Sequence, residues 1–94
     1  MTLQQIRYCL TIAQTGSMNR AAEQLYVTQP ALTGAIQELE QEVGVTIFNR
    51  TNRGVTLTND GRRFLHYARQ VYQQYELMEQ EYLRPKKRIF GVST

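Results

Sequence analysis

A row of uncharged polar side chains provides the most informative chemistry in this 94-residue sequence. Gln29, Thr33 and Gln37 follow one another at four-residue intervals, which places them on one face of a helix. A glutamine amide donates and accepts together and can match the edge of adenine, while a threonine hydroxyl can bond a base or contact a thymine methyl. Two arginines, Arg50 and Arg53, follow in a stretch with little apolar company. This pattern favours contact with the bases and phosphates of a nucleic acid.

The helix that must carry this row has signals at both ends. Thr28 can cap it, and Pro30 falls in its first turn, where the missing amide costs little. We expect it to run to about Val43, because Gly44 is suited to stopping it. Its inward face is an apolar stripe of Leu32, Ile36, Leu39 and Val43. A helix over roughly residues 29–43 therefore presents the polar row outward.

Two helices precede this one. The first is predicted over roughly residues 3–15 by apolar side chains at steps of three and four, namely Leu3, Ile6, Leu10 and Ala13. Thr2 and Gln5 have the spacing of a capping box, and Gly16 suits the end of the helix. Ser17 can cap a short second helix with small inward residues, Ala21, Ala22 and Leu25. The second and third helices, joined by a tight turn, predict a helix-turn-helix whose second member lies in the major groove.

A two-stranded hairpin is predicted after the third helix. Residues 45–48 have the composition of a strand, residues 52–54 that of a turn, and residues 55–57 that of a second strand. Arg50 and Arg53 are expected at the exposed tip of this hairpin. Such a wing can contact phosphate or enter a groove of the duplex.

A long fourth helix follows the hairpin. Thr58 can cap it and Pro85 ends it, so it is predicted over residues 59–84. Its apolar side chains repeat at steps of four and three and form a seam that we expect to pair two copies: Phe64, Ala68, Val71, Tyr75, Met78 and Tyr82. The predicted fold is mainly α, with a winged helix-turn-helix of three helices and a two-stranded wing over residues 1–58, followed by this dimerisation helix.

Composition limits the other classes of function. The formal net charge of +3 permits a polyanionic partner without identifying one. Cys9 is the only cysteine, so no internal disulfide is possible and a zinc site would lack thiolates. The first residues are too polar for a signal peptide, and no stretch approaches membrane-spanning length. We therefore expect a cytoplasmic protein without cofactor, metal site or membrane partner.

A longer pattern of residues resembles a known family. It comprises residues 16–25, Val27-Thr28-Gln29-Pro30-Ala31-Leu32-Thr33, Leu39-Glu40, Gly44-Val45, Phe48-Asn49-Arg50, Arg53-Gly54-Val55, Leu57-Thr58 and Gly61. This pattern, over about residues 2–83, resembles the N-terminal domain of LysR-type transcriptional regulators. The resemblance implies sequence-specific binding of double-stranded, dyad-symmetric DNA by a homodimer that controls transcription. It also implies that the long fourth helix links this domain to an effector-binding domain, and that only the effector-binding domain would bind a small molecule. A full-length regulator could further assemble into a tetramer.

The resemblance assigns roles to particular residues. It makes Gln29, Pro30 and Thr33 major-groove contacts and places Arg53 in or beside the minor groove. With the neighbours expected to contact DNA, the candidate set is Ser17, Arg20, Thr28, Gln29, Pro30, Thr33, Gln37, Arg50 and Arg53. The chain departs from the family pattern at Gly34, where a basic or long polar residue is usual, and at Cys9, where an aromatic is usual. Residues 88–92 resemble the first strand of the effector-binding domain, so we expect residues 85–94 to begin that domain and to be disordered in this chain.

Other interpretations stay open at this stage. Arg50 and Arg53 could be solvated surface charges, and the apolar residues of the last helix could pack against their own domain. Arg62 and Arg63 could contact the DNA backbone. Glu38 and Glu42 are expected on a solvated helix face, and His66 on the surface or at the edge of the seam. A coiled-coil adaptor and a fragment of an enzyme are the alternative functions, although the sequence contains no set of acid, base and metal ligand.

Overall fold

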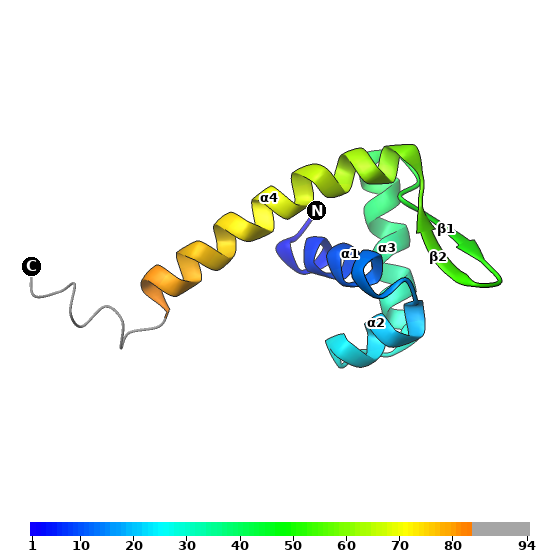
Figure 1. Cartoon of the computed structure of the whole chain (residues 1–94), viewed down its shortest axis with the longest axis horizontal. Helices are drawn as coiled ribbons and strands as arrows, with labels where there is room; N and C mark the ends of the chain where they lie inside the picture. The colour runs from blue at the N-terminus through cyan, green and yellow to red at the C-terminus, as the bar shows by residue number, and fades with distance from the viewer. Residues whose placement is uncertain (84–94) are drawn as a thin grey trace, which may run out of the picture.

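The computed structural model describes residues 1–83 and contains four helices and one hairpin (Figure 1). The helices are α1 (Leu3–Thr15), α2 (Met18–Leu25), α3 (Gln29–Val43) and α4 (Asn59–Tyr82), and the strands are β1 (Phe48–Thr51) and β2 (Gly54–Leu57). This order confirms the predicted winged helix-turn-helix with a long helix behind it. The predicted strand in residues 88–92 and the expected disorder of residues 85–94 lie outside the described residues.

Every helix begins at a hydroxyl residue in extended conformation. The side chains of Thr2, Ser17, Thr28 and Thr58 each accept a hydrogen bond from an amide of the first turn. Thr2 and Gln5 form the complete capping box that their spacing predicts. Gly16 and Gly44 adopt the left-handed conformation after α1 and α3, which confirms the predicted ends of both helices.

The core lies where α1, α2 and α3 meet the base of the hairpin and the first turns of α4. Its largest fully buried side chains are Cys9, Ile12, Leu32, Leu39, Ile47 and Leu65. The small residues Ala21 and Ala22 of α2 are also buried, which allows α2 to approach its neighbours closely. The outward face of α3 is thereby held at a fixed angle to α2 and to the hairpin.

The hairpin begins three residues later than the sequence predicts. β1 pairs with β2 in antiparallel register from Phe48 opposite Leu57 to Thr51 opposite Gly54, so the loop has only two residues. Residues 45–47 do not join the ladder because their backbone is held elsewhere. The Glu40 carboxylate accepts the amides of Ile47 and Phe48 at 2.7 and 3.2 Å, and the Ile47 carbonyl accepts the Thr58 amide at 3.0 Å.

The hairpin is tied to the turn between α1 and α2. The Val55 amide donates to the Gly16 carbonyl at 3.0 Å. Gly54 stands at a φ of 134°, which favours glycine, and a Cβ placed on it would lie 2.4 Å from the Gly16 carbonyl oxygen. A side chain at Gly54 would therefore push the hairpin away from the helices that it flanks.

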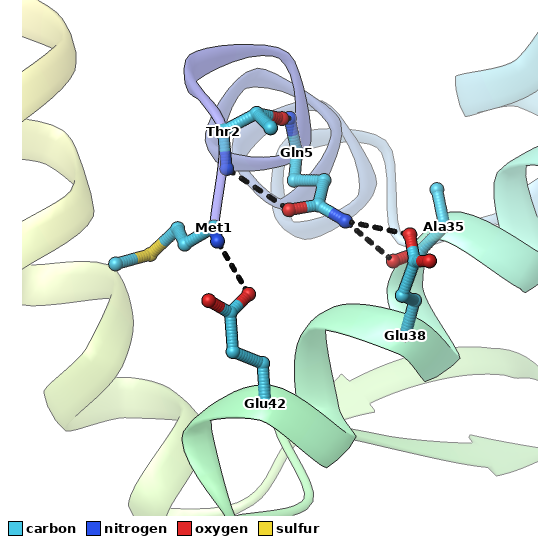
Figure 2. Close-up of polar contacts among 6 residues, drawn as sticks. All are labelled: Met1, Thr2, Gln5, Ala35, Glu38 and Glu42. Carbon is cyan, nitrogen blue, oxygen red and sulfur yellow. Dashed lines mark hydrogen bonds and ion pairs between the residues drawn. The ribbon is translucent and has the colours of Figure 1, made fainter.

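Polar contacts fix the start of α1 against the C-terminal half of α3 (Figure 2). The buried Gln5 side chain accepts from the Thr2 amide at 3.0 Å and donates to the Glu38 carboxylate at 3.2 Å and the Ala35 carbonyl at 3.5 Å. The amino group of Met1 pairs with the Glu42 carboxylate. Glu38 and Glu42 are exposed as expected, and in addition they join two helices.

Candidate nucleic-acid interface

The outward face of α3 carries the polar row that the sequence predicts. Gln29, Pro30 and Gln37 are exposed, and Thr33 is half-buried between them. Gly34 is exposed beside Thr33, with nothing within 4 Å of a Cβ placed there. No residue from Gln29 to Gln37 is charged. The face can therefore exchange hydrogen bonds with base edges but has no cation of its own.

The beginning of α2 and the hairpin flank this face. Ser17 and Gln29 line one open hollow of about 240 Å³ together with Arg50 of β1 and two residues that the sequence analysis did not select, Asn19 and Asn52. The Ser17 hydroxyl accepts the Arg20 amide at 3.2 Å, while the Arg20 side chain is exposed. Asparagines near a helix start and in a turn are also common structural residues, so their types alone did not indicate a role.

Arg50 does not lie at the tip of the hairpin, contrary to the prediction. It belongs to β1, opposite Val55, because the hairpin begins later than expected. Alternate residues of a strand point to the same face, so Arg50 shares the face of the buried Phe48. Its guanidinium reaches α3 and donates to the Thr33 hydroxyl at 2.8 Å.

Arg53 is the arginine that occupies the tip. It lies in the two-residue loop between the strands and its side chain is exposed. Its backbone amide donates to the Thr51 hydroxyl at 3.1 Å, and that hydroxyl donates to the Gly54 carbonyl at 3.1 Å. The loop backbone is thus ordered by Thr51, and the guanidinium is free to extend toward a partner.

We predict that Arg53→Ala weakens binding to every duplex, with a larger loss on sites flanked by A·T-rich DNA. A narrow minor groove concentrates negative potential and attracts an inserted arginine. Binding isotherms on matched sites with A·T and G·C flanks would measure the difference. Equal affinities of the parent and the variant on both sites would remove the hairpin tip from the interface.

The second half of α4 extends beyond the other helices (Figure 1). It carries exposed apolar side chains. Val71, Met78 and Tyr82 of the predicted seam are 49%, 54% and 65% exposed. Two further residues, Tyr67 and Leu77, are 65% and 50% exposed and were not selected from the sequence. Tyr67, Val71, Met78 and Tyr82 recur at helical spacing and form what we call the α4 stripe.

Three residues of the predicted seam face their own domain instead. Ala68 is 3% exposed, and Phe64 is half-buried against the core. Tyr75 is half-buried and lines a hollow with Leu3 and Arg7 of α1. The exposed apolar side chains of α4 thus lie on a face rotated from the predicted seam, because α1 covers the adjacent face of α4.

The basic residues near the start of α4 are not brought together with α3 and the hairpin. Arg62 and Arg63 line an open hollow whose other lining residues are His66 and Tyr67. The Arg62 guanidinium donates to the Asn59 side chain at 3.1 Å. His66 is exposed, as expected. These arginines therefore lie outside the surface formed by α2, α3 and the hairpin.

Titratable side chains within residues 1–83 do not gather into a metal centre. Cys9 is fully buried, and burial, with a further contribution from the charge of Glu40, raises the pKa of its thiol to about 12. Within residues 1–83, no three His, Cys, Asp or Glu side chains come together as a metal site requires. None of the helices in the same part of the chain is long and apolar enough to cross a bilayer.

Comparison with known proteins adds independent findings. The family model for bacterial regulatory helix-turn-helix proteins of the lysR family matches residues 3–62. The transcriptional regulator ClcR of Pseudomonas putida is 43% identical over 77 residues, which are 82% of this chain and 26% of ClcR. A RuBisCO operon transcriptional regulator of Allochromatium vinosum is 38% identical over 80 residues, covering 85% of this chain and 26% of the relative. The chain thus spans about a quarter of the length of these relatives.

Solved structures agree with the sequence relatives. The DNA-binding domain of CbnR in complex with DNA matches with a TM-score of 0.79 at 32% identity, over 100% of both chains. The DNA-binding domain of BenM in complex with catB site 1 DNA matches with a TM-score of 0.84 at 31% identity, over 100% of this chain and 97% of the other. The predicted fold class is confirmed by both. The sequence relatives are named as transcriptional regulators and not as enzymes.

Proposed function

Because this chain belongs to the LysR family of bacterial regulatory helix-turn-helix proteins, we propose that it binds a dyad-symmetric site in double-stranded DNA as a homodimer and so controls transcription. In this proposal α3 enters the major groove and its row of Gln29, Thr33 and Gln37 reads base edges. The beginning of α2 contacts the backbone through Ser17 and Arg20, and Thr28 and Pro30 lie at the point of entry. Arg53 at the hairpin tip reaches the neighbouring minor groove.

One observation carries the proposal. The amide-rich face of α3 is exposed between two flanking elements, and both flanks offer polar or cationic groups on the same side of the molecule. A solvated helix face alone would not need a hairpin that is tied at 3.0 Å to the α1–α2 turn and that holds Arg50 against the same face. The similar domains of CbnR and BenM were solved in complex with DNA, which supports DNA as the partner of this chain.

The α4 stripe supports the homodimer. Its apolar side chains would stay in contact with water in a lone chain, and contiguous apolar surface of this kind marks interaction sites. Two half-sites related by a dyad would then match two copies of α3 related by the two-fold axis of the dimer. We further propose that the protein acts in the cytoplasm and that any small-molecule effector binds a part of the regulator outside residues 1–83.

Measuring affinity against salt concentration tests the proposal. Neutralising phosphates releases counterions, so binding to duplex DNA must weaken steeply as salt rises. The 94-residue chain should retain a random duplex at low salt and should enrich particular sequences from a random pool. A coiled-coil adaptor would bind no duplex at any salt concentration, and that result would reject the proposal.

We predict that Gln29→Ala lowers the affinity for the selected site by roughly 1–3 kcal/mol, the range for one good contact to a base edge. Discrimination should disappear at one base position in each half-site, because the lost amide read that base. Competition with all single-base variants of the selected site would show this. An equal loss on specific and random DNA would instead make Gln29 a contact that positions the protein.

A further inference from the structure

The unexpected position of Arg50 gives it a role different from that of the hairpin tip. Its guanidinium lies against α3, and its Nη2 donates to the Thr33 Oγ1 at 2.8 Å. Arg50 lines the hollow that contains Gln29 and also the hollow that contains Thr33 and Gln37. It therefore stands beside the middle of the polar row, although it comes from a different element.

The charge of Arg50 is available to a ligand. No carboxylate within residues 1–83 forms an ion pair with it. Glu40 lines the same hollow, but its carboxylate accepts the amides of Ile47 and Phe48. Arg50 has no further hydrogen bond in the described part of the chain, so most of the donors of its guanidinium remain unused.

The contact with Arg50 also determines what Thr33 can offer. A hydroxyl has one hydrogen to donate and lone pairs that accept. Because the Thr33 oxygen accepts from Arg50, its hydrogen points elsewhere, and it donates to no acceptor within residues 1–83. The Arg50 guanidinium then presents donors only, and the Thr33 hydroxyl adds one more donor beside its remaining lone pair. In the major groove guanine presents two acceptors, N7 and O6, whereas adenine presents one acceptor and one donor.

We propose that Arg50 and Thr33 act as one reading unit that selects guanine at a single position of each half-site. The inference rests on the proposed function and deepens it, because it names the base and the residues that read it. Arg50 supplies from β1 the cation that α3 lacks between Gln29 and Gln37. Thr33 holds the guanidinium in place beside the base edge, which lowers the entropy that an exposed arginine loses on binding.

The test is a selection of duplexes from a random pool by the 94-residue chain and its variants. Arg50→Lys keeps the charge but cannot make a bidentate contact, and Thr33→Val removes the hydroxyl at nearly constant shape. Arg50 is exposed and Thr33 is half-buried, so we expect both variants to fold. Thermal unfolding of each variant would verify this. Arg53→Ala is the matched control. It removes a cation from the same hairpin, but this cation forms no hydrogen bond with α3 in the described part of the chain.

The parent should prefer guanine at one position of each half-site. Arg50→Lys should reduce that preference by about fivefold or more, the lower end for a bidentate base contact, and leave the other positions unchanged. Thr33→Val should weaken the same position, and the double variant should lose less than the sum of the two, because the residues act together. Arg53→Ala should keep the guanine preference while it lowers affinity.

Three results would overturn the reading unit while leaving the proposed function in place. A uniform loss of affinity without a changed base preference would make Arg50 a phosphate contact. Effects of Arg50→Lys and Thr33→Val at different positions would show that the two residues act separately. Preference for a base other than guanine at the affected position would exclude the donor-only argument. A parent chain that enriches no sequence would overturn the proposed function itself, and the reading unit with it.

Discussion

Replacing Val71 and Met78 together with glutamate is expected to convert the proposed dimer of this chain into monomers. Both side chains lie on the α4 stripe, about half exposed, and are seven residues apart on one face of the helix. Two buried carboxylates in each copy would oppose association, since a charge without a partner is costly to bury. Affinity for a dyad-symmetric site should fall by roughly 10²-fold or more, because the second half-site is no longer bound by a linked copy. Sedimentation equilibrium would give the mass.

The control variant is Gln73→Glu with Gln80→Glu. It adds the same charge at the same spacing, at exposed positions on the other side of α4 from the stripe. This variant should stay dimeric and bind DNA nearly as the parent does. A dimer of unchanged mass after Val71→Glu with Met78→Glu would show that the α4 stripe is not the contact between copies.

Replacing Gly61 with alanine is expected to destabilise the domain by roughly 1–3 kcal/mol, as insertion of atoms into a well-packed site does. Gly61 lies in the first turn of α4, and a Cβ on it would stand 2.1 Å from the Ile47 carbonyl oxygen. The added methyl group must push α4 away from the base of the hairpin, where the Ile47 carbonyl also accepts the Thr58 amide. Thermal or urea unfolding would measure the loss.

Gly34→Ala, in α3, is expected to have the opposite effect on stability. Nothing lies within 4 Å of a Cβ at Gly34, so alanine should stabilise the folded chain by roughly 0.5–1 kcal/mol, the usual cost of glycine inside a helix. If both alanine variants raised the midpoint, the contact between α4 and Ile47 would be looser than the structure describes. If Gly34→Ala also lowered specific affinity, close approach of this helix to DNA would explain the glycine.

Much of the fold followed from interactions between residues near one another in the chain. A cap such as Thr28 acts on an amide three residues later, and Gly44 ends α3 because glycine adopts the left-handed conformation at low cost. The period of the α-helix likewise places the apolar stripe of α3 and its polar row on opposite sides. These local signals predicted the helices and the exposed Gln29 and Gln37 correctly.

The tertiary structure decided the features that depend on contacts between elements far apart in the sequence. β1 begins only at Phe48 because the amide and carbonyl of Ile47 are bound by Glu40 and Thr58, and this shift turns Arg50 from the hairpin tip toward α3. In α4, two overlapping apolar stripes are compatible with the spacing, and only packing against α1 determines which one is covered. Ala68 is therefore buried within its own chain, although the sequence placed it in the seam between two copies, and Tyr67, which was not selected, is exposed.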